Sequence, residues 1–290
     1  MLASSKAAVK KVLTHSSVAT RLRHFYYPEE PLPPADVASA VAQANAWLFT
    51  QKKSGTTLLC HSLAFYNAIR LEIPSIDFGS IERAGIGRKV GTDYNCLNGL
   101  LQFQNEHCCK AVVHTHSDLP RCKAPCLIVT TRDPLDFAVS SYFYFYRNRH
   151  ARKKTPVEVA LPKIMGTYCQ TYHAQVEAAQ RSENTIAISY EQLITNPFDA
   201  LAYCIEQLYG SLNAAALQSA IEMASVDQLK IYERKRGAAV VAAEGSFSSA
   251  HFVRSGEVGE GAEFFSRDQQ SIIYESLQKL HVPATGLFPS

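Results

Sequence analysis

The sequence predicts a single α/β domain in which helices flank a central parallel sheet. Short apolar segments rich in β-branched residues alternate with longer segments whose apolar residues recur at helical spacing. Connections of this kind place parallel strands in one sheet and cover both of its faces. At 290 residues, with 47% hydrophobic and 19% charged residues, the composition is that of an ordinary globular protein. We therefore expect one domain over residues 1–290.

In the first half of the chain, three predicted strands alternate with two predicted helices. The helices are expected over residues 35–46 and 56–71, where apolar residues follow helical spacing. The strands are short and apolar, and they span residues 47–50, 111–116 and 124–131. The second helix follows the first strand after only a short loop, so strand, loop and helix form one unit.

The second half continues the alternation. Asp133 and Pro134 begin a predicted helix over residues 134–148, because aspartate caps a helix and proline is favoured at its first position. Within the long helix that follows, Pro162 is the point where a break would occur. The remaining predicted elements are a helix over residues 156–180, a strand over 185–190 and a helix over 197–210 that Gly210 closes.

Two segments stand apart by composition. Residues 1–28 contain no acidic residue but five lysines and arginines. This composition fits either a transit peptide or an N-terminal arm that packs on the domain, and we favour an arm over residues 1–35. Residues 237–250 are rich in small residues, which predicts a mobile loop.

Charge and cysteine usage exclude several classes of protein. A net charge of +3 argues for neither nucleic acid nor a membrane surface as partner, but it suits a single polyanionic ligand. The basic stretch 147–154 predicts a solvated loop. The eight cysteines form no disulfide pattern, no signal-like stretch opens the chain, and no apolar run approaches a transmembrane length. We therefore expect reduced thiols and a cytoplasmic location.

One region is crowded with side chains that could bind zinc. Its spacing lacks the paired C-x-x-C hooks of zinc sites, so we expect no metal and keep zinc as a minor alternative. The residues concerned are His107, Cys108, Cys109, His114, His116, Cys122 and Cys126.

The stretch QKKSGTTLL, residues 51–59, has the parts of an anion-binding loop. It offers lysines, a small flexible centre and hydroxyls between a predicted strand and a predicted helix. Backbone N–H groups in such a turn, at a helix N-terminus, favour an anion. The G-x-x-x-x-G-K-[ST] pattern of a Walker A loop is absent. By itself the stretch fits a plain turn and helix cap equally well.

Three further stretches favour phosphate binding. RDPLDFAVS contains Arg132 and, two helical turns beyond Asp133, Ser140. An arginine fork and a hydroxyl on one side of a helix can share one phosphate. HFVRSGEVGE brings a second basic, glycine-containing turn late in the chain, and ISYEQLITNP places Tyr190 at a strand end.

Taken together, these stretches resemble the cytosolic-type sulfotransferases that use 3′-phosphoadenosine 5′-phosphosulfate (PAPS). The family's P-K-S-G-T-T-W loop corresponds to residues 52–58 here, and its R-[NDP]-x-x-D-x-x-V-S helix entry is closely matched by RDPLDFAVS. The family's K-T-H appears as His114-Thr115-His116, and its R-K-G-x-x-G-[DE] as residues 254–260. The motifs occur in the family's order over residues 47–265.

The resemblance implies a role for each matching residue. His116 would be the general base that takes the acceptor's proton, and Lys53 would stabilise charge on the leaving oxygen. Because a sulfuryl group carries less charge than a phosphoryl group, fixed cations would replace the metal that kinases need. The residues implied to bind PAPS are Lys53, Ser54, Gly55, Thr56, Thr57 and Leu58 at the loop, Arg132, Ser140, Arg254, Ser255 and Gly256 around the 3′-phosphate, and Tyr190 near the adenine.

The chain departs from the family pattern at several positions. Leu58 replaces the family's tryptophan, Ser255 replaces its second late basic residue, and His114 replaces the lysine before the catalytic histidine. The last change removes a supporting charge near the acceptor or makes it depend on pH. The family's C-terminal dimer signature has no clear match, so the oligomeric state stays open.

We therefore expect a sulfotransferase that acts on a hydroxyl or nitrogen of a small-molecule acceptor, with neither nucleic acid nor membrane as partner. The aromatic run 142–146 fits helix packing alone, while the resemblance implies that part of it borders the acceptor pocket. Acidic residues near the expected pocket indicate a polar or cationic acceptor, such as a secondary metabolite. These residues are Asp77, Glu82, Asp93 and Asp118. The alternatives are a catalytically silent nucleotide-binding protein and a kinase-like P-loop enzyme.

Overall fold

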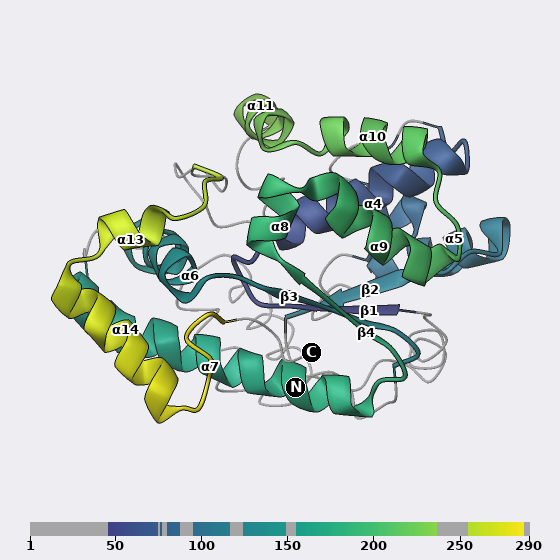
Figure 1. Ribbon diagram of the computed structural model, residues 1–290. Helices are drawn as coiled ribbons and strands as arrows, with labels where there is room; N and C mark the ends of the chain where they lie inside the picture. The colour runs from purple at the N-terminus through teal and green to yellow at the C-terminus, as the bar shows by residue number, and fades with distance from the viewer. Residues whose placement is uncertain are drawn as a thin grey trace, which may run out of the picture. The chain divides into compact units, whose positions relative to one another are not determined.

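The computed structural model describes the part of the chain that carries most of the predicted motifs (Figure 1). All of the described residues belong to the unit Ala40–Ser290. The expected helix over 35–46 lies almost wholly outside them, as do the N-terminal arm over 1–35 and the loop over 237–250. The described residues are 46–74, 76, 80–87, 95–116, 124–148, 155–236 and 255–286.

A four-stranded parallel sheet lies at the centre of the fold, as predicted. Its strands are β1 (Ala46–Thr50), β2 (Val112–Thr115), β3 (Leu127–Thr131) and β4 (Thr185–Ser189). They are arranged in the order β2-β1-β3-β4. The chain passes from β1 to β2 on one side and then to β3 on the other, so the sheet has a switch point between β1 and β3. Ligands of such sheets bind beyond the carboxyl ends of the strands at this point.

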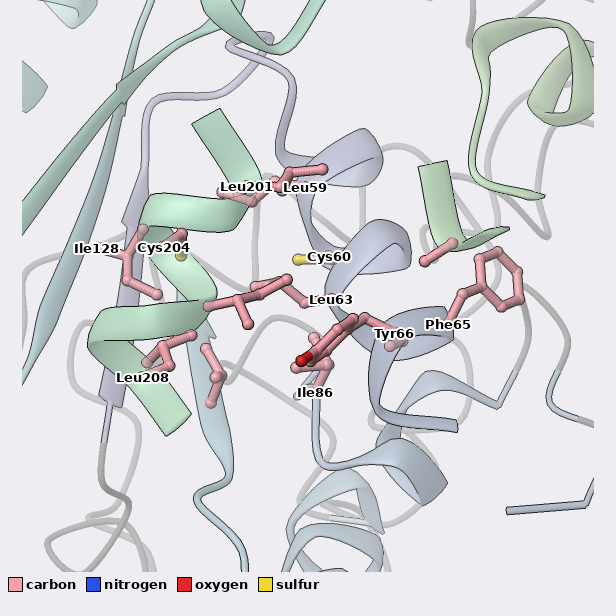
Figure 2. Packing of buried hydrophobic residues seen from close by; sticks show 14 of the residues in the cluster. Leu59, Cys60, Leu63, Phe65, Tyr66, Ile86, Ile128, Leu201, Cys204 and Leu208 are labelled. Carbon is pink, nitrogen blue, oxygen red and sulfur yellow. The ribbon is translucent and has the colours of Figure 1, made fainter. Parts of the chain in front are cut away.

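One face of the sheet is covered by helices that follow β1 and β4 (Figure 1). Leu59, Cys60 and Leu63 of the first of these helices pack with side chains of the second and third, and Figure 2 shows this cluster against Ile128 of β3. The helices on the sheet are α4 (Thr56–Arg70), α8 (Tyr190–Thr195) and α9 (Pro197–Tyr209), and α10 (Ala214–Met223) packs on α4 and α9. Burial of this apolar surface holds α4, and with it the loop at its start, against the sheet.

The other face carries a second apolar cluster around the long helix α7 (Val157–Arg181). The long helix forms as predicted, and Pro162, the one point at which a break was possible, lies inside it without ending it. A proline in the second turn removes one backbone hydrogen bond, and the neighbouring Leu161 is fully buried in the cluster. The cluster also contains residues of α6 (Pro134–Ser141) and α14 (Arg267–Lys279).

The predicted helix over residues 134–148 changes its winding midway. The α-helical part, α6, ends at Ser141, and the chain continues as a π-helical segment, η2 (Tyr142–Asn148). Wider π-helical turns are frequent at functional sites. None of the described helices combines the length and apolar character needed to cross a membrane. The other described elements are η1 (Ile81–Ala84), α5 (Asn95–His107), α11 (Val226–Arg236) and α13 (Glu260–Phe264).

Candidate active site

The predicted functional residues lie where the four strands end. Thr50 ends β1, and His116, Arg132 and Tyr190 each follow the last residue of β2, β3 and β4. Because the strands are parallel, these ends share one edge of the sheet. Thr50 and Tyr190 are 140 positions apart in the sequence (190 − 50), yet these strand ends bring both residues to one side of the fold.

The loop between β1 and α4 has the backbone of an anion cradle. Lys53 and Gly55 both have left-handed conformations, with φ of 69° and 83°. Such alternation directs successive N–H groups toward one side, and α4 adds its N-terminus directly after Gly55. A Cβ at Gly55 would lie 2.8 Å from the Tyr190 ring. Glycine is therefore required here by both conformation and space.

Hydroxyl groups of the loop form hydrogen bonds to other parts of the protein. Ser54 Oγ donates to the carbonyl of Gln51 at 2.6 Å and is in close contact with Thr130 Oγ1 on β3. Thr56 Oγ1 donates to Thr50 Oγ1 at 2.8 Å. These bonds tie the loop to the carboxyl ends of β1 and β3, a structural role that the motif alone did not indicate. Leu58, where the family has tryptophan, packs against the apolar cluster.

Aromatic rings of η2 contact the two loop lysines. Lys53 Nζ lies 4.4 Å from the centroid of the Tyr144 ring, and Lys52 Nζ lies 5.8 Å from that of Phe145. An ammonium over an aromatic face is attracted by the ring quadrupole. Sequence reasoning assigned the aromatic run to the acceptor pocket and did not predict this contact, because no local spacing links residues so far apart.

Arg132 joins the loop to a late segment of the chain. Its Nη1 donates to the Lys53 carbonyl at 3.0 Å, and its Nη2 donates to the Glu257 carbonyl at 3.4 Å. The guanidinium lies 3.9 Å from the centroid of the Tyr190 ring and is 6% exposed. Its Nε is buried and has no hydrogen-bond partner among the described residues. We call this group of four residues the Arg132 junction.

Two neighbouring side chains hold the backbone around Arg132. Tyr168 donates its hydroxyl to the Arg132 carbonyl at 3.0 Å. Burial raises the pKa of Tyr168, so this hydroxyl stays a donor at any ordinary pH. Asp133 caps α6 by accepting from the N–H groups of Leu135 and Asp136 at 2.9 and 3.0 Å. Burial, the largest cause, raises the pKa of Asp133.

Asp136 connects α6 to the end of the expected late motif and to the residue directly after it. It is fully buried, and its two carboxylate oxygens accept from the N–H groups of Gly259 and Gly261, both at 2.7 Å. The aspartate stands in the RDPLDFAVS motif, yet sequence reasoning assigned it no role. Its place in the first turn of a helix, where an acidic residue is favoured without any buried partner, gave no local signal of this role.

The late motif is described only from Ser255 onward. Ser255 Oγ donates to Glu260 Oε2 at 2.8 Å, and Gly256 has a left-handed φ of 82°. Arg254 lies outside the described residues, and Ser140 lies half-buried at the end of α6. A shared 3′-phosphate site of Arg132, Ser140 and Arg254 therefore stays a prediction.

His116 lies against the end of β1. Its Nδ1 is 2.9 Å from Thr50 Oγ1 and 3.1 Å from the Thr50 carbonyl oxygen. A carbonyl can only accept, so its position beside Nδ1 favours the tautomer of the neutral ring with the proton on Nδ1 and the lone pair on Nε2. His114 contacts the same Thr50 hydroxyl through Nε2 at 3.0 Å, and the two rings meet edge to face.

A metal centre is not indicated by the described residues. No group of three or more histidine, cysteine, aspartate or glutamate side chains among them could hold a metal ion. Cys122, one of the candidate zinc ligands, lies outside the described residues. Cys108 is exposed while Cys126 is buried.

The fold and the site together define a class of enzyme. Residues 43–281 match the model of the sulfotransferase domain, and the chain belongs to that family, as the motifs predicted. No curated protein matches the sequence.

Solved structures of sulfotransferases share this fold. Mouse sulfotransferase SULT7A1, complexed with PAP, has 17% identity and a TM-score of 0.54, over 84% of this chain and 89% of that one. Retinol dehydratase with androsterone and the inactive cofactor PAP has 16% identity and a TM-score of 0.53, over 81% and 80% of the two chains. A second complex of retinol dehydratase, with retinol and PAP, has 16% identity and a TM-score of 0.52, over 85% of this chain and 86% of that one.

Proposed function

We propose that the protein transfers the sulfuryl group of PAPS to a hydroxyl or nitrogen of a small-molecule acceptor and releases adenosine 3′,5′-bisphosphate. The observation that carries the proposal is that the loop, the Arg132 junction and His116 meet at one edge of the sheet in a sulfotransferase-family chain. We expect this reaction to take place in the cytoplasm, without a metal.

The hydrogen-bond donors at this site fit a doubly phosphorylated nucleotide. The left-handed backbone at Lys53 and Gly55 suits a 5′-phosphate, and the buried Nε of Arg132 is a donor in need of an acceptor. The hydroxyls of Ser54 and Thr56 form hydrogen bonds within the protein, so we propose that these two residues bind the phosphate through their backbone N–H groups. The other residues assigned to the donor are Thr57, Leu58, Ser140, Tyr190, Arg254, Ser255 and Gly256.

His116 and Lys53 would act on opposite sides of the transferred group. His116 takes the acceptor's proton at Nε2 as the acceptor atom forms its bond to sulfur. The bond between sulfur and the donor's phosphate oxygen breaks, and the electron pair stays on that oxygen. Lys53 stabilises the resulting negative charge. The deprotonated acceptor thus leaves as a sulfate ester or sulfamate, and the proton stays on His116.

We further propose a polar acceptor, because acidic residues stand in the segments expected to surround the pocket. Of these, Glu82 is described, in η1, whereas Asp77, Asp93 and Asp118 lie outside the described residues. The androsterone and retinol found with retinol dehydratase belong to that protein. Turnover of such apolar alcohols in preference to polar ones would contradict this part of the proposal.

The experiment is an assay of bisphosphate release from PAPS by the purified protein with a panel of acceptors. His116→Ala should lower the rate by about 10²–10⁴, the usual range for loss of a general base. His173→Ala is the matched control, since this histidine is exposed on α7, where its ring bonds to the Leu280 carbonyl and lies beside Tyr172. Binding of the bisphosphate without turnover would support the silent binder instead.

A thermal-shift titration distinguishes a sulfotransferase from the kinase-like alternative. The 3′,5′-bisphosphate should stabilise the protein more than ATP or adenosine 5′-phosphosulfate, because a ligand stabilises in proportion to its affinity for the folded state. Equal stabilisation by all three nucleotides would refute PAPS as the donor.

A further inference from the structure

The Thr50 hydroxyl lies at the centre of three hydrogen bonds at the end of β1. Thr50 is fully buried, and its Oγ1 is 2.8 Å from Thr56 Oγ1, 3.0 Å from His114 Nε2 and 2.9 Å from His116 Nδ1. The two histidines reach it from β2 and the residue after it, because side chains two positions apart on a strand share a face. Register places His114 beside Leu48, its neighbour on β1.

The protons of this group can be assigned by counting donors and lone pairs. A hydroxyl has one proton to donate and two lone pairs to accept. Thr56 donates to Thr50 Oγ1, since its other acceptor, the Gln51 carbonyl, is 3.5 Å away. His116 Nδ1 also donates, because the Thr50 carbonyl beside it can only accept. Both lone pairs of Thr50 Oγ1 are then used.

With this assignment for His116, the remaining proton of Thr50 is directed at His114 Nε2, which accepts it. His114 is then neutral, with its own proton on Nδ1. Both rings adopt the Nδ1–H tautomer, which is the less common form of free histidine in water. A lysine at position 114 could only donate. His114 thus acts here as a hydrogen-bond acceptor and does not replace the family lysine as a cation.

We propose that Thr50 is a positioning residue for His116, and that His114 is the neutral acceptor that orients the Thr50 hydroxyl. By drawing the hydroxyl proton toward itself, His114 turns a lone pair of Thr50 Oγ1 toward His116 Nδ1–H. The ring of His116 is then held by two oxygens of one residue, with Nε2 as the basic nitrogen. The inference rests on the proposed function only in that His116 is the base.

A hydrogen bond that orients the base also stabilises the imidazolium formed when the proton arrives. Carboxylates do the same for the histidine of serine hydrolases, where they hold the ring in the required tautomer. Here a neutral hydroxyl and a carbonyl replace the carboxylate, so a smaller contribution is expected. A second histidine two residues away supplies the acceptor that completes the chain of bonds.

The first test needs no turnover. In the full chain labelled with ¹⁵N-histidine, without donor or acceptor and at a pH where the rings are neutral, His114 and His116 should each show a protonated Nδ1 and an unprotonated Nε2. Thr50→Val should release His114 from this tautomer, because valine keeps the shape but removes the donor. A proton on Nε2 of either ring in the wild-type chain would overturn the assignment, whatever the enzyme's activity.

The second test is kinetic. Thr50→Val should lower kcat about ten- to a hundredfold with little change in acceptor KM, as for the loss of one hydrogen bond to a charged group. Thr50→Ser should restore most of the rate. His114→Gln, whose amide oxygen can accept near the Nε2 position, should be faster than His114→Leu. If Thr50→Val does not fold, the comparison of His114→Gln with His114→Leu and the tautomers of the wild-type chain still decide the proposal.

A double variant distinguishes positioning from general structural support. In the His116→Ala background, Thr50→Val should cause no further loss of rate, because the residue it positions is gone. A loss equal to that in the wild-type background would overturn the positioning role. Failure of all acceptors to turn over would instead refute the proposed function and leave the tautomer result standing.

Discussion

The loop over residues 52–57 and the Arg132 junction are neighbours at the sheet edge, but their geometry has different origins. The loop is shaped by consecutive residues, through left-handed backbone at Lys53 and Gly55. The junction joins Arg132 to the carbonyls of Lys53 and Glu257, which lie 79 and 125 positions away. A sequence motif can therefore encode the loop within itself, whereas the junction exists only once the domain has packed.

The two regions also depend on each other. Tyr190 lies under the Arg132 guanidinium, and the same ring occupies the space that a side chain at Gly55 would need. Arg132 in turn donates to the loop's backbone at Lys53. Variants at these points can show whether the loop keeps its shape without the junction.

Gly55→Ala should have the largest effect on stability, because it disturbs both regions. The left-handed φ of 83° costs a Cβ-bearing residue about 1–2 kcal/mol, and contact with the Tyr190 ring adds a packing cost of about 1–3 kcal/mol. We expect a loss of about 2–5 kcal/mol in urea denaturation.

Gly210→Ala is the matched control for this change. Gly210 has a similar φ of 74°, but a Cβ there would meet nothing within 4 Å. The loss of stability in Gly210→Ala should therefore stay near the conformational cost alone, about 1–2 kcal/mol. Equal losses for both variants would mean that the Tyr190 ring moves away without penalty and that loop and junction are not coupled through it.

Asp136→Asn should break the support of the junction without touching the loop. One of two buried bonds from Gly259 and Gly261 to the carboxylate is lost, and the new amide N–H₂ faces a backbone donor. We expect a loss of about 3 kcal/mol in the free energy of unfolding. The control Asp199→Asn changes an exposed carboxylate of α9 and should cost less than about 0.5 kcal/mol. A near-neutral Asp136→Asn would show that the late segment is held by other contacts.

Arg132→Ala should weaken binding of the 3′,5′-bisphosphate about ten- to a hundredfold, since a hydrogen bond to a charged group contributes about 1.5–3 kcal/mol. Binding of adenosine 5′-phosphosulfate, which depends on the loop alone, should change little. Calorimetric titration of both ligands measures the two effects. If both affinities fall by the same factor, Arg132 acts by holding the Lys53 carbonyl and the loop is not self-sufficient.

Tyr190→Leu should have the smallest free-energy effect of the four variants, here on the affinity for the 3′,5′-bisphosphate. It removes the ring face beneath Arg132, and a cation–π contact contributes about 0.5–2 kcal/mol. Tyr190→Phe keeps the ring and should retain that contribution, so the difference between the two variants in bisphosphate affinity isolates it. A larger loss for Tyr190→Phe would instead assign the role to the phenolic hydroxyl.

Much of the fold was predictable because its signals are local. The strand–loop–helix unit around residues 47–71, the entry of α6 at Asp133 and Pro134, and the end of α9 at Gly210 follow from neighbouring residues. Local signals were insufficient where packing overrides local preference. The buried face of α7 carries the helix through Pro162, and the helix after α6 widens into η2.

What the sequence by itself determined, therefore, is the set of chemical groups and the short segments that present them. The tertiary structure decided their partners. Strand alternation places His114 and His116 on one face, but only the strand order β2-β1-β3-β4 puts Thr50 between them. Likewise, only the packing of α6 against α13 gives Asp136 the N–H groups of Gly259 and Gly261. The physical reason is that hydrogen bonds and ring contacts act over a few ångströms, while the residues that make them are separated along the chain by distances that no local pattern spans.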